Sequence, residues 1–149
     1  MWKGGSSGPL FFLCKDYGTA QMALKRLPVL FFVAESTAKG RQQPLVMDDA
    51  KLTTAAQRRA EEIATVNSHV RPNGTKWYTV LSEYGVTDAA AGENAAWGSV
   101  SPEEVVNAWM NSEGHRANIL NPEARAMGVG YYYNSSSTWG HQWIQLFTK

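Results

Sequence analysis

Two short segments near the end of the sequence alternate in polarity or side-chain size, and this pattern constrains the fold more than any other feature. In residues 127–133, a methionine, a valine and two tyrosines occupy every second position, and a second alternation runs from Trp143 to Phe147. Such alternation is typical of β-strands with one buried face. The polar link over residues 134–140 suits a hairpin loop, so we expect the two strands to pair antiparallel.

Helical spacing dominates the sequence before this predicted hairpin. Asp48 or Asp49 can accept hydrogen bonds from the free amides that open a helix, so the first helix is expected to follow. Its buried stripe is predicted to comprise Leu52, Ala55, Ala56, Ala60, Ile63 and Ala64. The charged residues Lys51, Arg58, Arg59, Glu61 and Glu62 are assigned to its other faces.

Two further helices are predicted from their ends. Residues 76–84 form one that ends at Gly85, where a left-handed residue can close the last turn. Residues 101–104 (SPEE) form a helix start in which Ser101 caps and Glu104 completes a capping box. Helices followed by a hairpin indicate an α+β fold rather than a repeating βαβ sheet.

The length and composition indicate one folded domain. A chain of 149 residues suits a single packed core. We assign residues 1–42 to an irregular leader, with a weak signal-like segment over residues 22–38, and residues 43–149 to the domain. No apolar run approaches the roughly 20 residues of a transmembrane helix. The formal charge of +1 disfavours nucleic acid as a partner, and Cys14, the single cysteine, excludes internal disulfides.

Few residues are candidates for chemistry. The chain has three histidines, and His69 and His115 lie too far apart in sequence to form a local metal motif. The motifs of serine hydrolases, P-loop enzymes and dinucleotide-binding enzymes are absent from the sequence. Only the fold could bring these histidines together.

Four ordered motifs carry a resemblance to a known family. They are AGEN (residues 91–94), VVNAWMNSEGHRANILNP (105–122), MGVGYYY (127–133) and HQWIQLF (141–147). With them, the chain resembles the bacterial branch of the CAP superfamily, which comprises the cysteine-rich secretory, antigen 5 and pathogenesis-related 1 proteins. These bacterial members are also called SCP-like extracellular proteins. The resemblance covers roughly residues 43–149, with SHVRPNG (68–74) in its expected place.

The resemblance implies a fold and a site. The implied fold is an α-β-α sandwich, in which a small antiparallel sheet lies between helical layers. The implied cleft holds two histidines and two acidic residues, of which His69, Glu93 and His115 match by motif. At the fourth position this chain has Ser112, with Glu113 one residue later, and one helical step rotates a side chain by about 100 degrees. The family's usual first helix is not recognisable before residue 43.

The implied trio has two chemical interpretations. Two neutral imidazoles and an oxygen ligand suit zinc, with His69 and His115 as candidate ligands and an open position for water. Alternatively, Glu93 orients the imidazoles in a hydrogen-bonded cluster that binds no metal. Both interpretations stay open at the level of sequence.

Three functions follow from these interpretations. The favoured one is a secreted or envelope-associated binding module, whose cleft engages a lipid, a peptide or a cell-wall ligand. The second is a metal-assisted hydrolase of the peptidase type, with Glu93 as candidate general base. The third is a structural component of the envelope or spore coat. The lack of a complete catalytic triad favours a binding protein over an enzyme, and secretion is expected from the resemblance.

Overall fold

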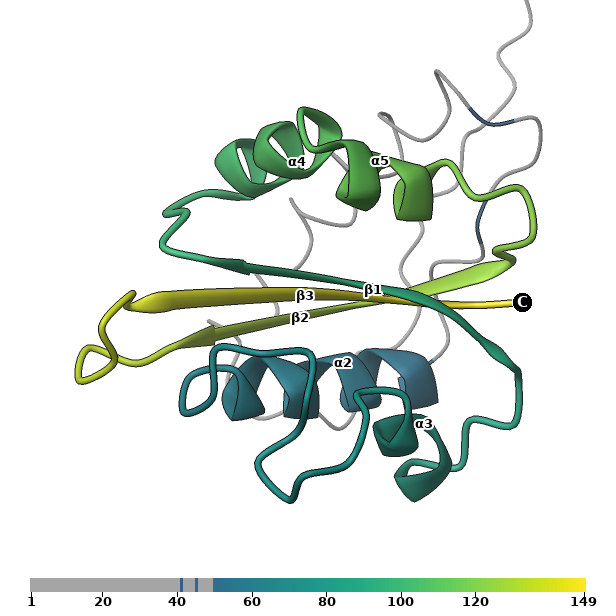
Figure 1. Ribbon diagram of the computed structural model, residues 1–149, viewed down its shortest axis with the longest axis horizontal. Coiled ribbons are helices and arrows are strands. Elements are labelled where there is room, and N and C mark those ends of the chain that lie inside the picture. The colour runs from purple at the N-terminus through teal and green to yellow at the C-terminus, as the bar shows by residue number, and fades with distance from the viewer. Residues whose placement is uncertain (1–40, 42–44, 46–49) are drawn as a thin grey trace, which may run out of the picture.

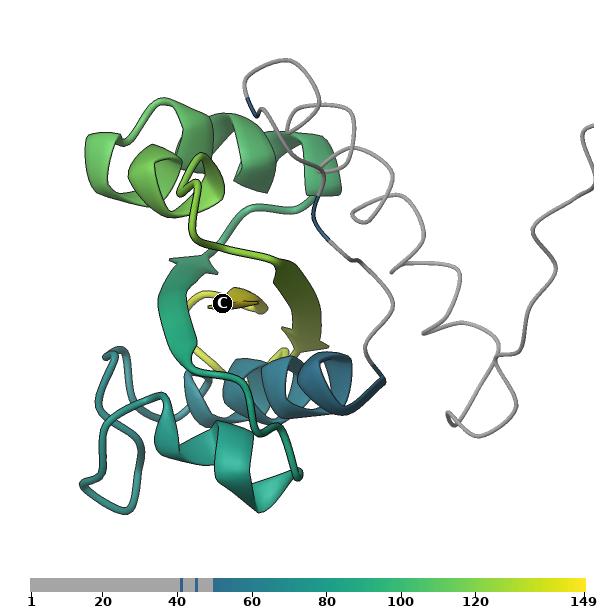
Figure 2. The same ribbon diagram turned by 90° about the vertical axis from the view of Figure 1, so that its right-hand side faces the viewer.

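The fold is a sheet covered by helices on both faces (Figure 1). This computed structural model describes residues 41, 45 and 50–149. Helices α2 and α3 cover one face, and α4 and α5 cover the other (Figure 2). In chain order the elements are α2 (Ala50–Glu62), α3 (Thr79–Glu83), β1 (Ala90–Trp97), α4 (Pro102–Met110), α5 (Glu113–Ile119), β2 (Ala126–Tyr133) and β3 (His141–Thr148). The predicted α-β-α sandwich is confirmed.

The sheet has three antiparallel strands in the order β1-β3-β2. The predicted hairpin is confirmed: β2 and β3 pair directly, with Tyr131 opposite Trp143. Strand β3 also pairs with β1, where Leu146 lies opposite Glu93. This central place explains why β3 is buried along almost its whole length, Gln142 and Gln145 included.

Two glycines let helix α2 approach strand β2 closely. A Cβ atom on Gly128 would lie 2.5 Å from the Leu52 carbonyl oxygen, and one on Gly130 would lie 2.1 Å from that of Ala56. Such distances are far inside van der Waals contact, so only glycine fits at these positions. The alanine-rich stripe of α2 therefore lies directly on the β2 backbone at these two positions, and it also packs against core side chains such as Ile144 and Leu146 of β3. The predicted buried residues Leu52, Ala55, Ala56, Ala60 and Ile63 are all buried, whereas Ala64 is half-buried.

The predicted polar faces of α2 need correction. Helical spacing assigns Arg59 and Glu62 to faces other than the buried stripe, but both side chains are buried. Helical spacing locates a charged residue around the axis, yet it does not reveal a charged partner on another element. Here such partners lie on β1 and on the loop after α2, and they compensate the cost of burial.

The helix ends are predicted more accurately than the helix lengths. Helix α3 spans only Thr79–Glu83, inside the predicted 76–84, and Gly85 has the expected positive φ of 69°. At α4 the Ser101 hydroxyl accepts from the Glu104 amide at 3.2 Å, as predicted. The Glu104 carboxylate, however, accepts from the Val100 amide, one residue earlier than a capping box requires.

Hydrophobic cores fill both sides of the sheet. Trp109 of α4 and Trp143 of β3 are buried in the core between the sheet and the α4–α5 layer. Trp77 and Trp97 are partly buried and pack against the core beneath α2 and α3. Strand β1 and helix α5 were not predicted from residue patterns, and β1 is a third strand between the helices of the two layers.

Several predictions lie outside the described residues. They concern the leader, its signal-like segment, Cys14 and the helix start at Asp48 or Asp49. Arg41, which is described, donates from its guanidinium to the carbonyl oxygens of Ile119, Asn121 and Ala124 at 2.6–2.8 Å. Among the described residues, no helix has both the length and the apolar character needed to cross a bilayer.

Candidate functional site

Strand β1 holds the buried carboxylate of the site. The Glu93 side chain is fully buried, and Arg59 of α2 reaches both of its oxygens. The Arg59 Nε atom donates to Oε2 at 2.8 Å, and Nη2 donates to Oε1 at 3.1 Å. A guanidinium that binds a carboxylate in this forked way fixes its position as well as balancing its charge. Glu93 is therefore a rigid, pre-oriented acceptor.

His69 also contacts this carboxylate, at the oxygen that Arg59 Nη2 reaches. Its Nδ1 atom lies 2.7 Å from Glu93 Oε1, while 57% of its side chain remains exposed. The loop that carries it is held by two contacts, from the Trp77 amide to the His69 carbonyl and from Arg59 Nη2 to the Ser68 carbonyl. The hydrogen bond to Glu93 raises the pKa of His69 above its ordinary value, although partial burial opposes this shift.

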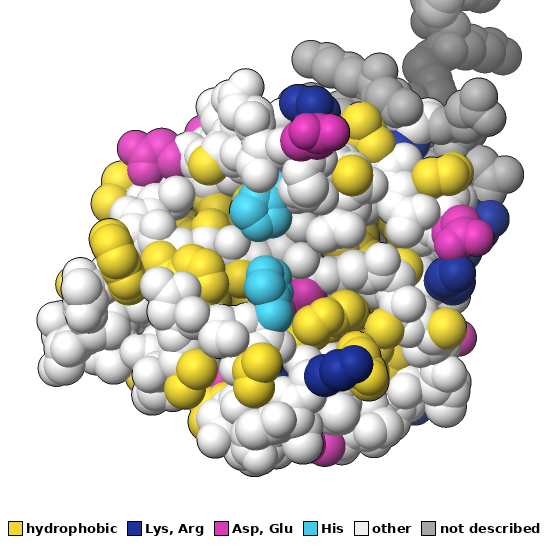
Figure 3. Space-filling view, viewed as in Figure 1, with side chains coloured by type: hydrophobic (Ala, Val, Ile, Leu, Met, Phe, Trp, Pro, Cys, Tyr) yellow, Lys and Arg dark blue, Asp and Glu magenta, His cyan; other side chains and the backbone are white. Residues whose placement is uncertain are grey.

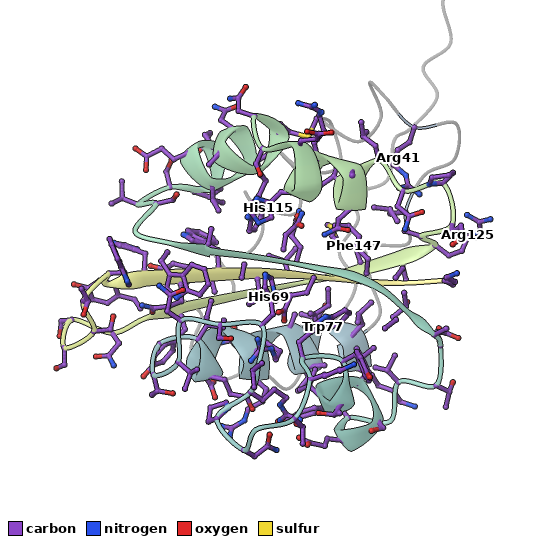
Figure 4. The ribbon with its side chains drawn as sticks, in the orientation of Figure 1. Arg41, His69, Trp77, His115, Arg125 and Phe147 are labelled. Atoms are coloured by element: carbon purple, nitrogen blue, oxygen red, sulfur yellow. The ribbon has the colours of Figure 1, made fainter. Side chains whose placement is uncertain are left out.

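His115 comes to the same surface from the other helical layer. It lies in α5, on the opposite side of β1 from His69, and the two imidazoles lie near each other on one face (Figures 3 and 4). Burial lowers the pKa of His115, and the neighbouring His69 lowers it further. The site therefore pairs an imidazole whose charge is favoured with one whose charge is disfavoured. We call His69, Glu93 and His115 the histidine site.

The AGEN segment also anchors α5 to the sheet. Asn94 donates to the His115 carbonyl at 3.1 Å, and Asn118 donates to the Glu93 carbonyl at 3.2 Å and to the Asn94 side chain at 2.8 Å. A Cβ atom on Gly92 would lie 2.8 Å from the Asn118 side-chain oxygen, so glycine leaves room for this contact. The side chains of Asn94 and Asn118 thus hold α5 against β1.

Arg59 also belongs to a larger network of ion pairs, which continues away from Glu93 through α2 to α3. Arg59 also donates to Glu62 at 2.9 Å, and Glu62 in turn accepts from Arg71 at 2.7 Å. Arg71 continues to Glu83 of α3 at 2.6 Å. Burial opposes the charge of Glu62, but the two arginines outweigh it and lower the pKa of this carboxyl. The network ties α2, α3, β1 and the His69 loop together.

Sequence reasoning missed the network residues Arg59, Glu62 and Arg71. The signal was present in part, because Arg59 and Glu62 are three residues apart on a helix and Arg71 lies inside the SHVRPNG motif. Helical periodicity alone places Arg59 and Glu62 on faces of α2 other than the buried stripe. Their burial depends on Glu93, which lies more than thirty residues later in the chain.

The fourth position does not join the trio. Ser112 is the N-cap residue of α5 but makes no capping hydrogen bond with its side chain. Glu113 is exposed in the first turn of that helix. Within residues 50–149, no hydrogen bond or ion pair joins Glu113 to His69, Glu93 or His115. The structure thus brings together three of the candidate residues.

If the site holds a metal ion, its side chains suit two imidazole ligands, His69 and His115, better than three ligands that include Glu93. Both Glu93 oxygens already serve Arg59 and His69, so Glu93 has the place of a group that orients a metal-ligating histidine from behind. The described part of the chain contains no group of three or more His, Cys, Asp or Glu side chains arranged to hold a metal ion. Catalytic zinc sites usually have three protein ligands. Zinc binding by His69 and His115 stays a prediction.

Comparison with known proteins gives matches in sequence and in fold. A family model described as "CAP: Cysteine-rich secretory protein family" matches residues 36–147. The protein YkwD of Bacillus subtilis strain 168 is 41% identical over 118 residues, which are 75% of this chain and 45% of YkwD. The membrane protein YlbC of the same organism is 40% identical over 63 residues, which are 42% of this chain and 18% of YlbC. The chain thus spans less than half the length of either relative.

Two solved structures share the fold. An extracellular protein containing an SCP domain from Bacillus anthracis superposes with a TM-score of 0.73 at 22% identity, covering 91% of this chain and 45% of that one. An outer surface protein from Borrelia burgdorferi gives a TM-score of 0.72 at 22% identity, covering 85% of this chain and 92% of that one. At this level of identity the likeness concerns the fold alone.

Proposed function

Because the chain belongs to the cysteine-rich secretory protein (CAP) family, we propose that it is a secreted or envelope-associated protein that binds a ligand at the histidine site. Extracellular and outer-surface proteins among its structural neighbours support this location. We further propose that the ligand is a peptide of the cell wall that presents a carboxylate.

One observation carries the choice of binding over hydrolysis. Both oxygens of Glu93 are occupied, by Arg59 at 2.8 and 3.1 Å and by His69 at 2.7 Å. A general base must reach the proton that it removes and must be able to accept it. A buried carboxylate held by a guanidinium and an imidazole is better suited to orienting His69 toward a ligand.

The choice of ligand rests on the charges at the surface of the site. The bond to Glu93 favours protonated His69, which leaves the other ring nitrogen as an outward donor. The neutral form of His115 can accept or donate. A carboxylate would gain a charge-assisted hydrogen bond from His69 and a second hydrogen bond from His115.

The test is titration of the folded chain with a synthetic wall stem peptide, followed by NMR of the histidine ring protons. We expect the His69 and His115 signals to move together, and His69→Ala and His115→Ala each to weaken binding about tenfold or more. His141→Ala is the matched control, because this histidine bonds to Tyr131 at the other end of β3. Binding that persists in both site variants, or that requires anionic lipid vesicles instead of the peptide, would refute the proposal.

Zinc binding is tested separately by calorimetric titration near neutral pH. If the two imidazoles hold the ion, both His69→Ala and His115→Ala abolish the heat of binding, whereas Glu93→Gln only weakens it because Glu93 acts behind His69. A folded wild-type sample that gives no heat would leave the trio as a hydrogen-bonded cluster.

A further inference from the structure

A second surface lies at the end of the sheet where the β2–β3 hairpin meets the loop between β1 and α4. The described residues expose five large hydrophobic side chains, and three of them lie here: Val100 at 64%, Tyr133 at 53% and Trp139 at 52%. Hydrophobic side chains gather at this end in Figure 3, on the left of the two histidines. We call Val100, Tyr133, Trp139 and His141 the aromatic platform.

Contacts between the two loops hold the platform together. The Gly98 amide donates to the His141 carbonyl at 2.9 Å, and the Trp143 indole donates to the Ser99 carbonyl at 2.7 Å. A Cβ atom on Gly98 would lie 3.8 Å from the ring of Trp139, which therefore rests beside this turn. The exposed indole belongs to a defined surface rather than to an isolated loop tip.

A row of rings connects the platform to the core. The buried Trp143 ring lies 4.2 Å from that of Tyr131, measured between centroids, and the exposed Tyr133 ring lies 4.8 Å from His141. Between these pairs, the Tyr131 hydroxyl lies 2.9 Å from His141 Nδ1. Packing and this hydrogen bond fix the orientation of the rings before any ligand arrives, which lowers the entropic cost of binding.

The platform is polar at its margins but almost free of charge. The adjoining loop (residues 134–140) carries an asparagine, three serines and a threonine, and its turn is fixed by hydrogen bonds to Asn134 and Ser137. Residues 126–148 contain no Lys, Arg, Asp or Glu. One charged group lies beside Val100: the Glu104 carboxylate, which accepts from the Val100 amide. This margin disfavours polyanions, which proteins bind through Lys and Arg.

We propose that the aromatic platform binds an uncharged glycan chain. Sugar rings present flat C–H faces, which are attracted to the negative faces of Trp and Tyr rings, and their hydroxyls match the amide and hydroxyl groups of the loop. Exposed aromatic rings beside Ser and Asn form surfaces with large rigid contacts and adaptable hydrogen bonds. The inference does not depend on the histidine site, since it uses other residues and another ligand chemistry.

The experiment measures binding of three uncharged oligosaccharides to the full chain by tryptophan fluorescence and calorimetry: hexamers of N-acetylglucosamine, glucose and mannose. We expect at least one to bind, and Trp139→Ala and Tyr133→Ala each to weaken it about tenfold or more. Tyr78→Ala is the matched control, because this exposed tyrosine lies before α3 and outside the platform. His69→Ala should also leave sugar binding unchanged.

Each other outcome would overturn the proposal. Folded wild-type protein that binds none of the three sugars has no such glycan site. Equal binding by wild type and the Trp139→Ala, Tyr133→Ala double variant places the sugar elsewhere. Binding of an anionic wall polymer in place of the sugars, with affinity that falls steeply with salt, would identify a charged partner. A thermal melt of each variant checks that its fold is retained.

Discussion

The two imidazoles of the histidine site face different electrostatic surroundings. His69 contacts a buried carboxylate, whereas His115 contacts no acidic side chain within the described residues and is affected by burial and by His69 itself. The pKa of His69 is therefore raised and the pKa of His115 is lowered, although both side chains are imidazoles. At one pH the site can therefore hold a protonated His69, which donates a hydrogen bond, beside a neutral His115, which can donate or accept one.

We predict that the ring-proton titrations of the two histidines bracket the ordinary histidine value of 6.5. NMR should give a pKa above this value for His69 and below it for His115. Glu93→Gln should lower the pKa of His69, because the charged acceptor is lost. Coincident titrations in the wild type would contradict this account.

The directions of these two pKa shifts determine how the stability of the fold changes with pH. The pKa of His69 is raised on folding, so its contribution is complete below about pH 6.5 and is lost as the pH rises through the folded pKa. The pKa of His115 is lowered, so the folded state loses stability as the pH falls from about 6.5 through its folded pKa. Urea unfolding of His69→Gln should lack the first effect and keep the second.

Removal of the buried guanidinium should destabilise the fold strongly. Arg59→Met leaves Glu93 without its forked partner and Glu62 with one partner fewer, and the loss of one partner from a buried ion pair costs about 3–5 kcal/mol. Arg58→Met is the control, since Arg58 is half exposed and its contacts, to exposed Glu61 at 3.6 Å and to buried Glu62 at 3.3 Å, are longer than those of Arg59. We expect that change to cost less than about 1 kcal/mol. Similar urea midpoints for the two variants would contradict the importance of the network.

At this scale, the sequence motifs named three residues that lie together in the structure, whereas helical spacing misplaced a charged residue whose partner is remote. His69, Glu93 and His115 followed from the family motifs. Arg59 did not, because its helical neighbourhood is polar and its partner lies on β1. Whether a charged side chain can be buried depends on a partner in another segment. Periodicity describes one segment at a time and does not reveal that partner.

At the scale of elements, the contact between α2 and β2 shows how small residues set the spacing of layers. The Gly128 and Gly130 backbone lies directly beneath the carbonyls of Leu52 and Ala56. The helix therefore lies close to the sheet, and any side chain at position 128 or 130 would have to displace it.

We predict that alanine has opposite effects at two glycines. Gly130→Ala places a Cβ atom 2.1 Å from a backbone oxygen, so it should cost about 1–3 kcal/mol or more of unfolding free energy. Gly114→Ala lies in α5, where a Cβ atom would meet nothing within 4 Å, and should stabilise by about 0.5–1 kcal/mol. Chemical denaturation measures both. Equal effects would show that close approach does not control this interface.

Helices and strands marked by capping residues or by regular alternation could be predicted from the sequence, whereas elements without such patterns could not. The start of α4 and the β2–β3 hairpin followed from capping residues and alternation. Strand β1 has the sequence AAGENAAW, whose polar residues Glu93 and Asn94 are adjacent and both buried. Alternation is hidden there because one side chain serves the Arg59 network and the other anchors α5 on the opposite face.

For the whole molecule, β3 is the element most enclosed by others. It has a partner strand on each side and a helical layer above and below. Opening it requires both pairings and both cores to be lost, so its exposure should demand global unfolding.

We predict that hydrogen exchange is slowest at the amides of β3 and faster at those of α3. Helix α3 has five residues and contacts the rest of the fold through one face. Exchange followed by NMR should give β3 an opening free energy close to that of denaturant unfolding. Equal protection of α3 and β3 would indicate that the sheet and its covering helices open as one unit.

The central place of the last strand also bears on how the protein is made. Strand β1 leaves the ribosome more than forty residues before its partner β3, and β2 likewise has no neighbour until residues 141–148 emerge. At typical synthesis rates of about 5–20 residues per second, β1 stays unpaired for roughly 2–10 seconds and β2 for a shorter time. During that interval the two histidines of the histidine site lie on segments whose common sheet is not yet formed. A chaperone that prefers unpaired strands would thus find β1 and β2 available until translation has passed Thr148.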